Sequence, residues 1–285
     1  MQLRAIKDIF HKELFPQYPK GEIDSFFSLC IEHFLGLGQF TLVMQPGYTL
    51  THEEETPLFQ ALSRLKTNEP IQYILGKAYF RDLILSVNEH TLIPRPETEE
   101  LVQWVIDDVR HATVNDIKIL DIGTGSGCIA IALAKELSNA QVFALDIAPG
   151  ALELAQQNAQ ENKVKVNFME ADVFHMKWDM EFDIIVSNPP YVREMEKVQM
   201  HENVTSYEPG TALFVPDNDA LRYYRAIAEC AQKCLRPDGL LYLEINQYLS
   251  TETKTLFEAH LFQENRLKKD IFGNYRFLRC KKIAE

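Results

Sequence analysis

The spacing of apolar side chains predicts helices over roughly the first 75 residues. Ile6, Phe10 and Leu14 recur at helical spacing, and residues 23–34 repeat the pattern, which places the apolar side chains on one face of each helix. A third helix is predicted to begin at Thr56-Pro57, because threonine is a good N-cap and proline is tolerated in a first helical turn. We therefore expect a helical domain over residues 1–76.

The pattern then changes to the alternation that is typical of β-strands. Within residues 77–96 apolar side chains recur at every second position, and Asn88-Glu89-His90 has the polar composition of a turn between two strands. This segment is expected to be a β-hairpin that links two domains. Pro94-Arg95-Pro96 then stiffens the entry to a helix predicted over Thr98–Val109.

From residue 117 onward, short apolar runs alternate with amphipathic segments. Continuous apolar runs are typical of parallel strands that helices cover on both faces. Near the end of the chain, Gly273-Asn274 stands between two strand-like runs and predicts a last antiparallel pair. Residues 97–285 are therefore expected to form a Rossmann-like α/β domain around a doubly wound, mostly parallel sheet.

Charge narrows the range of partners. The 285 residues hold 29 Lys and Arg against 41 Asp and Glu, a formal net charge of −12, which disfavours binding to a phosphate backbone. Residues 266–282 are an exception, with seven basic residues and only Asp270 as an acid. A solvated strand edge is favoured there over an RNA-facing patch, because lysine commonly protects edge strands.

Membrane and metal sites are not expected. No apolar run approaches the roughly 18 residues of a membrane helix, and the N-terminus lacks the pattern of a signal peptide, so we expect a cytoplasmic protein. The five cysteines form no Cys-x-x-Cys pair and are expected to be packed thiols. Cys230 and Cys234 are four residues apart on a predicted helix, but without a second pair of ligands packing is favoured over metal binding.

A glycine turn follows the first strand of the α/β domain. Ile117–Ile122 runs directly into Gly123-Thr124-Gly125-Ser126-Gly127 and then into a predicted helix, so that a ligand can approach the backbone closely. The G-x-G-x-G spacing differs from the G-x-G-x-x-G fingerprint of dinucleotide sites, which weakens the case for a bound pyrophosphate.

Acidic residues stand beside this turn and at the next two strand ends. Asp121 opens the loop, and Asp146 ends the second strand, where a carboxylate can bind both hydroxyls of a ribose. Asp172 ends the third strand and could accept a hydrogen bond from adenine, while Val173 or Phe174 packs against the ring. Because no lysine or arginine stands there for phosphate, the sequence predicts a nucleoside cofactor without phosphates, and S-adenosylmethionine fits best.

Asn188-Pro189-Pro190-Tyr191 follows the fourth strand, at the same predicted sheet edge and beside the expected cofactor. The prolines fix φ at about −65° and cannot continue a paired strand, so the chain leaves the sheet rigidly. The Asn188 side-chain oxygen and the Pro189 carbonyl could accept two hydrogen bonds from one planar NH2 group, with Tyr191 packed behind it. We expect catalysis by positioning and by these two acceptors, without a metal or a covalent intermediate.

The segment 92–100 leaves two interpretations open. It combines rigid prolines with Arg95 and Glu97. It either roofs the active site between the domains or has a structural role.

Several of these motifs together resemble the protein-(glutamine-N5) methyltransferases that modify class I peptide chain release factors, the HemK/PrmC family. The matching segments cover nearly the whole chain and lie at residues 69–76, 92–99, 121–127, 188–191 and 207–213. The Asn-Pro-Pro-Tyr motif at 188–191 is shared with adenine methyltransferases, whereas the segments 69–76 and 92–99 are more specific to this family.

The resemblance implies the class I methyltransferase fold, a helical domain that grips the release factor, and methyl transfer from S-adenosylmethionine to N5 of the glutamine in a Gly-Gly-Gln motif. It implies that Gly123–Gly127 and Asp146 hold the cofactor, that Val173 faces adenine, and that Asn188–Tyr191 hold the glutamine amide. Phe80 would line the substrate side. The chain departs from the family pattern at Val173, where an aromatic residue is expected, and at residues 214–219, where a glycine-rich stretch is common.

The main alternative is an amino-methyltransferase acting on adenine N6 or guanine N2 of nucleic acid. Such an enzyme is expected to carry a basic recognition surface, but residues 1–90 hold eight Lys and Arg against eleven acids. We therefore expect no direct nucleic-acid substrate. A non-catalytic nucleoside-binding module and a nicotinamide oxidoreductase are disfavoured by the complete Asn188 motif and by the glycine spacing.

Overall fold

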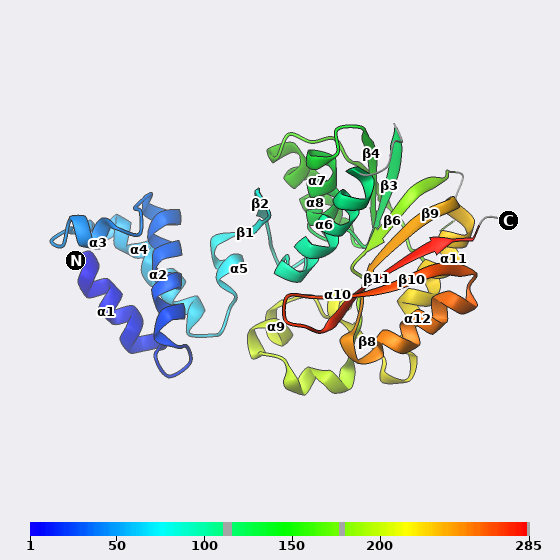
Figure 1. Ribbon diagram of the computed structural model, residues 1–285. Helices are drawn as coiled ribbons and strands as arrows, with labels where there is room; N and C mark the ends of the chain where they lie inside the picture. Colours follow the sequence, from blue (N-terminus) through cyan, green and yellow to red (C-terminus); the bar gives the residue numbers. More distant parts are fainter. Residues whose placement is uncertain (111–115, 177–179, 284–285) are drawn as a thin grey trace. The chain divides into compact units, whose positions relative to one another are not determined.

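The computed structural model describes residues 1–110, 116–176 and 180–283. The chain divides into two compact units (Figure 1). The first contains Met1–Gly76 and also His201–Tyr207, a segment that the sequence analysis did not assign to it. The second contains Lys77–Met200 and Glu208–Glu285. The hairpin expected as a linker thus belongs to the second unit.

The first unit is helical, as the apolar spacing predicts. Its continuous core is built from the inward faces of the first, second and fourth helices, with Phe10 packed edge-on against Phe27 at 5.3 Å between ring centroids. Its elements are α1 (Leu3–Leu14), α2 (Lys20–Leu35), α3 (Thr41–Met44), α4 (His52–Leu65), α5 (Ile71–Leu75) and α9 (Glu202–Tyr207).

The start of α4 corrects one prediction. The helix begins at His52 rather than at Thr56, because Thr51 is the N-cap. Thr51 accepts a hydrogen bond from the Glu54 backbone N–H, and the Glu54 carboxylate accepts one from the Thr51 N–H. This reciprocal capping box satisfies two otherwise unpaired N–H groups.

The second unit is built on a seven-stranded sheet in the order β10-β11-β9-β6-β3-β4-β5. The strands from β9 to β5 run parallel, and β11 is antiparallel to both β9 and β10. This confirms the mostly parallel sheet and the last antiparallel pair. The strands are β3 (Ile117–Ile122), β4 (Ala140–Asp146), β5 (Asn167–Glu170), β6 (Phe182–Ser187), β9 (Leu235–Glu244), β10 (Phe262–Lys269) and β11 (Tyr275–Lys282).

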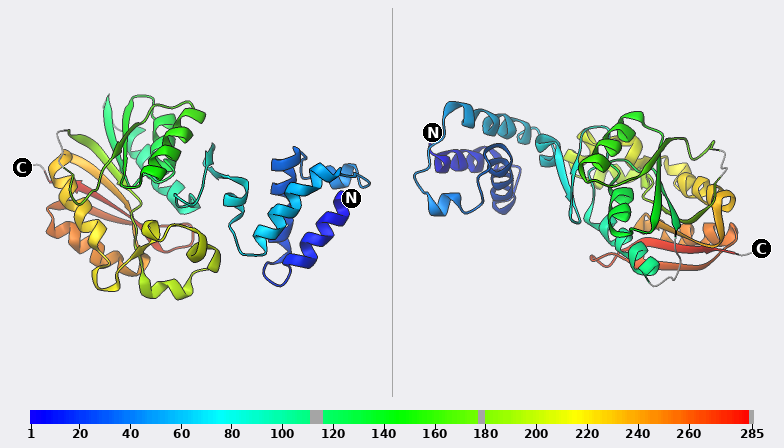
Figure 2. Two further views of the ribbon diagram at one scale, coloured as in Figure 1. Left: turned by 180° about the vertical axis from the view of Figure 1, so that it is seen from behind. Right: turned by 90° about the horizontal axis from the view of Figure 1, so that it is seen from above.

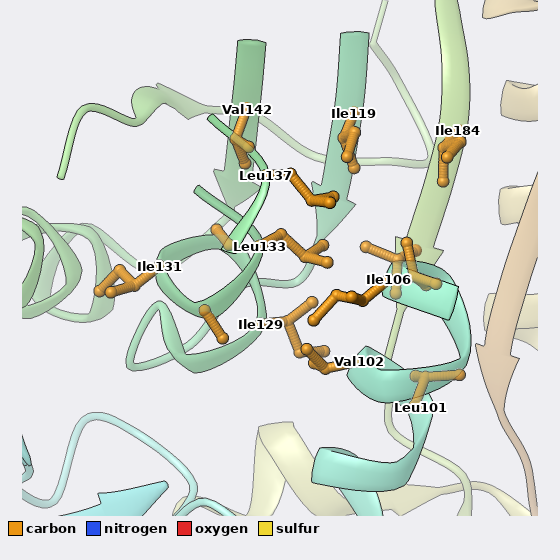
Figure 3. Packing of buried hydrophobic residues seen from close by; sticks show 14 of the residues in the cluster. Leu101, Val102, Ile106, Ile119, Ile129, Ile131, Leu133, Leu137, Val142 and Ile184 are labelled. Atoms are coloured by element: carbon orange, nitrogen blue, oxygen red, sulfur yellow. The ribbon is translucent and has the colours of Figure 1, made fainter. Parts of the chain in front are cut away.

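Helices cover both faces of this sheet (Figures 1 and 2). On one face lie α6 (Pro96–Arg110), α7 (Cys128–Glu136) and α8 (Pro149–Glu161), and on the other lie α11 (Arg222–Cys234) and α12 (Ser250–Ala259). Figure 3 shows the core that α6 and α7 form with the sheet, where Val102 and Ile106 of α6 lie against Ile129 of α7. Burial of these apolar side chains fixes both helices over the strand that leads into the glycine turn.

The β-hairpin exists, but its turn was predicted wrongly. Strands β1 (Lys77–Phe80) and β2 (Leu83–Ser86) are joined by Arg81-Asp82, and Arg81 takes φ +50°. Asn88 instead organises a loop by accepting a hydrogen bond from the His90 N–H. The hairpin is tied to α8, because Asn158 exchanges two hydrogen bonds with the Ser86 backbone.

Short elements follow β6 and complete the second unit. The two-residue strands β7 and β8 pair in parallel, which joins the segment after Tyr191 to the segment 214–219. Met195 also donates its N–H to the Asp217 carboxylate. These elements are β7 (Val192–Arg193), α10 (Gly210–Leu213), β8 (Phe214–Val215) and three 3-10 turns at Glu194–Gln199, Asp217–Asp219 and Gln247–Leu249.

The basic side chains of residues 266–282 have partners within the second unit. Arg279 forms an ion pair with Asp108 at 2.8 Å, and Lys281 forms one with Asp238 at 2.8 Å. The other five basic side chains also have partners, either acids, aromatic rings or backbone carbonyls. These contacts favour the strand-edge interpretation over an RNA-facing patch.

Four of the five cysteines are buried, as expected for packed thiols, and Cys128 is half-buried. Cys230 and Cys234 lie with their sulfur atoms 3.6 Å apart inside the core. Within the described ranges, no helix is both long and apolar enough to cross a bilayer.

Candidate active site

A cavity of about 400 Å³ lies in the second unit at the carboxyl ends of β3, β4 and β6. The volume is typical of a small-molecule site. The chain reverses its strand order at β3, which has β4 on one side and β6 on the other, and α/β sheets bind ligands at such points. Of the predicted glycine turn 123–127, residues 123–126 line this cavity and Gly127 does not. The predicted residues 172–174, 188–190 and Asp146 also line it.

The glycine turn needs backbone conformations that other residues avoid. Gly123, Gly125 and Gly127 take φ of +73°, +54° and +83°. A Cβ atom at Gly123 or Gly125 would meet nothing within 4 Å, whereas at Gly127 it would lie 2.9 Å from Ile131 and 3.2 Å from the Ala155 side chain. The first two glycines thus leave the backbone open toward the cavity, and the third lets α7 pack closely against α8.

Asp146 is tied to the glycine turn. One carboxylate oxygen accepts the Gly125 N–H at 2.8 Å, and the other accepts the Ala148 N–H at 3.0 Å. Because each carboxylate oxygen can accept more than one hydrogen bond, this arrangement leaves acceptor capacity for a ligand in the cavity.

Asp121 is fully buried beneath the same turn. It accepts a hydrogen bond from the Thr124 hydroxyl at 2.6 Å. Burial raises the pKa of Asp121 to about 7, and the nearby Asp146 carboxylate contributes in the same direction. The residue therefore braces the loop from below rather than facing the cavity.

The loop that follows β5 brings Asp172, Val173 and Phe174 to the cavity wall. Asp172 accepts the Phe174 N–H at 3.0 Å and bonds to the His175 ring at 2.7 Å. The Phe174 N–H lowers the pKa of Asp172, with His175 acting in the same direction. Val173 packs against the core that α11 forms with the sheet, while Phe174 is 39% exposed. Both side chains line the cavity, so the choice between them as the adenine contact stays a prediction.

Asn188, Pro189 and Pro190 follow β6 and line the cavity. Ser187 fixes the end of this strand, because its hydroxyl donates to the Ile122 carbonyl of β3 at 2.6 Å. The Asn188 side-chain NH2 donates to the Thr98 hydroxyl at 3.2 Å. The Asn188 motif is therefore held beside the glycine turn.

Tyr191 does not line the cavity, although the sequence analysis placed it behind the reacting nitrogen. Its hydroxyl donates to the Glu244 carboxylate at 2.8 Å, and its backbone carbonyl accepts from the Asn246 side chain at 3.0 Å. Burial and the Glu244 carboxylate raise the pKa of Tyr191. Tyr191 thus anchors the end of the motif from the side away from the cavity.

Phe80 is likewise not at the site. It is fully buried in the core beneath α6, with Leu83 and Leu85 of the same hairpin. A side chain in that position cannot contact a substrate, so its predicted substrate-lining role is not supported. The resemblance alone implied that role, and the alternation along the hairpin did not say what Phe80 faces.

Two arginines line the cavity, Arg95 from the segment 92–100 that was left open and Arg222, which no motif marked. Arg95 lines the cavity and pairs with Glu208 at 2.6 Å, and Glu208 also accepts the Ile93 N–H. Arg222 lies over the Phe174 ring, 5.1 Å from its centroid. The motif at residues 92–99 was the available signal for Arg95, whereas no pattern marked Arg222.

A curated protein of Flavobacterium psychrophilum (strain ATCC 49511 / DSM 21280 / CIP 103535 / JIP02/86), named release factor glutamine methyltransferase, is 48% identical to this chain over 281 residues. The similarity covers 98% of this chain and 99% of that protein. The chain belongs to the release factor glutamine methyltransferase family. A protein of the same name from Bacteroides thetaiotaomicron is 43% identical and covers 92% of this chain and 93% of its own length.

Two segments of the chain match family models. Residues 20–76 match the PrmC N-terminal domain, and residues 103–207 match the methyltransferase small domain. A solved methyltransferase from Pyrococcus furiosus is similar in fold, with a TM-score of 0.52 and 17% identity, and the match covers 79% of this chain and 99% of that one. Family membership therefore agrees with the resemblance inferred from the motifs, and the α/β unit has the methyltransferase fold.

Proposed function

We propose that this protein transfers a methyl group from S-adenosylmethionine to the side-chain amide nitrogen of the glutamine in the Gly-Gly-Gln motif of class I release factors. The observation that carries the proposal is the meeting of Asn188 and Pro189 with the glycine turn in one cavity. Family membership supports the choice of substrate. The proposal implies that the protein acts in the cytoplasm.

The cavity residues fit the cofactor. The open backbone at Gly123 and Gly125 accommodates a ligand in close contact, and Asp146 offers acceptors suited to ribose hydroxyls. Apolar contacts for adenine come from Val173 and Phe174. S-adenosylmethionine supplies an electrophilic methyl group carried on a sulfonium, and the cavity offers it acceptors and apolar walls. Of the two cavity arginines, Arg95 is paired with Glu208 and Arg222 lies over the Phe174 ring.

The protein's part in the reaction is to hold the glutamine NH2 group. Its two hydrogens would donate to the Asn188 side-chain oxygen and the Pro189 carbonyl, which fixes the plane of the amide. As the nitrogen gains positive charge, both acceptors bind it more strongly, and this difference lowers the barrier. The nitrogen then releases one proton to solvent, so no strong base is needed at the site.

The charge of the chain disfavours the nucleic-acid alternative. The basic side chains of residues 266–282 are engaged within the second unit, and the whole chain carries a formal charge of −12. Phosphate binding depends on free Lys and Arg. These charges favour a protein substrate.

The proposal is tested with the purified protein, labelled S-adenosylmethionine and three acceptors, namely a class I release factor, duplex DNA and rRNA. We expect label in the release factor alone, and mass spectrometry should find one added methyl group on the glutamine of the Gly-Gly-Gln peptide. A release factor in which that glutamine is replaced is the matched control. Transfer to nucleic acid with none to the release factor would refute the proposal.

A further inference from the structure

A buried chain of hydrogen bonds ends at Asn188. Glu244 is 2% exposed, and its two carboxylate oxygens accept hydrogen bonds from two hydroxyl groups. The Thr98 hydroxyl donates to one oxygen at 2.7 Å, and the Tyr191 hydroxyl donates to the other at 2.8 Å. The Thr98 oxygen in turn accepts the Asn188 side-chain NH2 at 3.2 Å.

The chain has a direction that follows from the chemistry of its members. An ionised carboxylate only accepts hydrogen bonds, so the single hydrogen of the Thr98 hydroxyl is used toward Glu244. The Thr98 oxygen can then offer only lone pairs to Asn188. Because only the NH2 end of a carboxamide donates, that end must face Thr98, and the Asn188 oxygen is left for the cavity.

We propose that Thr98 and Glu244 are positioning residues that select the orientation of the Asn188 carboxamide in which its oxygen meets the NH2 group of the substrate. The inference rests on the proposed function. In the opposite orientation, the Asn188 NH2 would face the substrate NH2. Two donors would then meet, and one of the two acceptors that hold the reacting nitrogen would be lost.

Three elements keep the carboxylate in place. Glu244 ends β9, Thr98 lies in the first turn of α6, and Tyr191 follows β6. Arg276 of β11 reaches the Tyr191 hydroxyl at 3.4 Å and pairs with Asp270. Both hydroxyls and the Arg276 charge favour ionised Glu244 and oppose the effect of burial. The orientation of Asn188 thus depends on residues from three separate parts of the sequence.

Protonation of Glu244 removes this selection. A protonated carboxyl can donate to Thr98, whose hydroxyl can then turn and donate to the Asn188 oxygen. Burial raises the pKa of Glu244, and Glu97 of α6 adds to the effect, while Thr98, Tyr191 and Arg276 oppose it. Other titratable groups facing Glu244 are Tyr224 of α11 and Cys128 of α7. Turnover should therefore fall on the acid side at a higher pH than the protonation of an exposed glutamate would cause.

The experiment compares Thr98→Val, which keeps the shape but removes the hydroxyl, with Thr98→Ser, which keeps the hydroxyl. Methylation of the release factor is followed as kcat and KM, and cofactor affinity is measured by calorimetry. We expect kcat of Thr98→Val to fall about ten- to a hundredfold, with cofactor affinity within about twofold of wild type. Thr98→Ser should retain most of the wild-type kcat.

A Glu244→Gln variant provides a second measurement, which decides the matter if Thr98→Val does not fold. A glutamine amide can either accept from or donate to Thr98, so kcat should fall and the loss of turnover at acid pH should disappear. Wild-type kcat in Thr98→Val, or an unchanged acid limb in Glu244→Gln, would overturn the positioning role. If wild-type protein methylates no release factor, the proposed function fails instead, which separates the two outcomes.

Discussion

Asn188 illustrates how one hydrogen bond decides which end of a nearly symmetric side chain faces a ligand. Its NH2 group is engaged by the Thr98 hydroxyl, so the side chain presents its oxygen elsewhere. The motif predicted Asn188 as an acceptor. No motif predicted Thr98 and Glu244 as partners, because they are 146 residues apart and meet only after the sheet has formed.

Removal of the acceptor should affect turnover more than cofactor binding. For Asn188→Ala we expect kcat to fall about 10²- to 10³-fold, since one of two groups that stabilise charge on the nitrogen is lost. Asp146→Ala is the contrasting variant and should mainly weaken cofactor affinity, measured by calorimetry. Wild-type turnover in Asn188→Ala would contradict the proposed role of its oxygen.

Asp121 should make stability depend on pH. Its pKa is about 7 in the folded protein, above the value of about 3.9 in an unfolded chain. Between these values the folded state binds more protons, so this residue's contribution to the free energy of unfolding falls as pH rises from about 4 to about 7. Asp121→Asn should lose that dependence.

Chemical denaturation of both proteins at several pH values across this interval tests the expectation. The difference in unfolding free energy, variant minus wild type, should increase toward the upper end of the interval. A constant difference across the whole range would show that Asp121 is ionised throughout.

At the scale of elements, the glycine turn joins β3 to α7 and packs that helix against α8. Gly127→Ala would force a Cβ atom to 2.9 Å from Ile131 at φ +83°. Gly273 is a matched control, because it takes φ +85° and a Cβ atom added there would meet nothing within 4 Å. The comparison separates strain in the backbone from crowding.

We expect Gly273→Ala to lower the free energy of unfolding by about 1 kcal/mol, from backbone strain alone. Gly127→Ala should cost about 2 kcal/mol or more, because close packing adds to the same strain. Urea unfolding measures both. Equal losses would mean that the contact between α7 and α8 adapts without cost.

The apolar pattern predicted most elements of both units, since helical spacing and continuous apolar runs directly reflect burial. It failed where local chemistry competed. The turn of the β1–β2 hairpin uses Arg81 at positive φ, without the glycine or asparagine that usually marks such a turn. Likewise, the signal for α4 at Thr56-Pro57 was overruled by the capping box at Thr51, one turn earlier.

Of the site, the strand-end residues were predictable, because parallel strands bring their carboxyl ends to one edge. The orientation of Tyr191 was not, since its hydroxyl is drawn to the buried Glu244 carboxylate rather than to the cavity. Phe80 shows the same limit, because alternation along a strand does not say what its inner face covers.

For the molecule as a whole, the excess of acidic residues predicts that nucleic acid does not bind and does not inhibit the protein. An excess of rRNA or duplex DNA should leave the rate of release-factor methylation unchanged at low salt, because the described basic side chains of residues 266–282 have partners within the protein. Filter assays with a fixed release-factor concentration measure this directly. Inhibition that disappears at higher salt would reveal a phosphate-binding surface.

The helix α9 comes from the middle of the chain yet belongs to the first unit. The Tyr207 hydroxyl donates to the Thr67 carbonyl at 2.7 Å, and the Asn68 side chain donates to Glu202 at 3.1 Å. A single cut after Gly76 would therefore strip the amino-terminal fragment of one helix and leave that helix unpartnered in the remainder. Chimaeras that exchange the first unit between members of this family should transplant both pieces together.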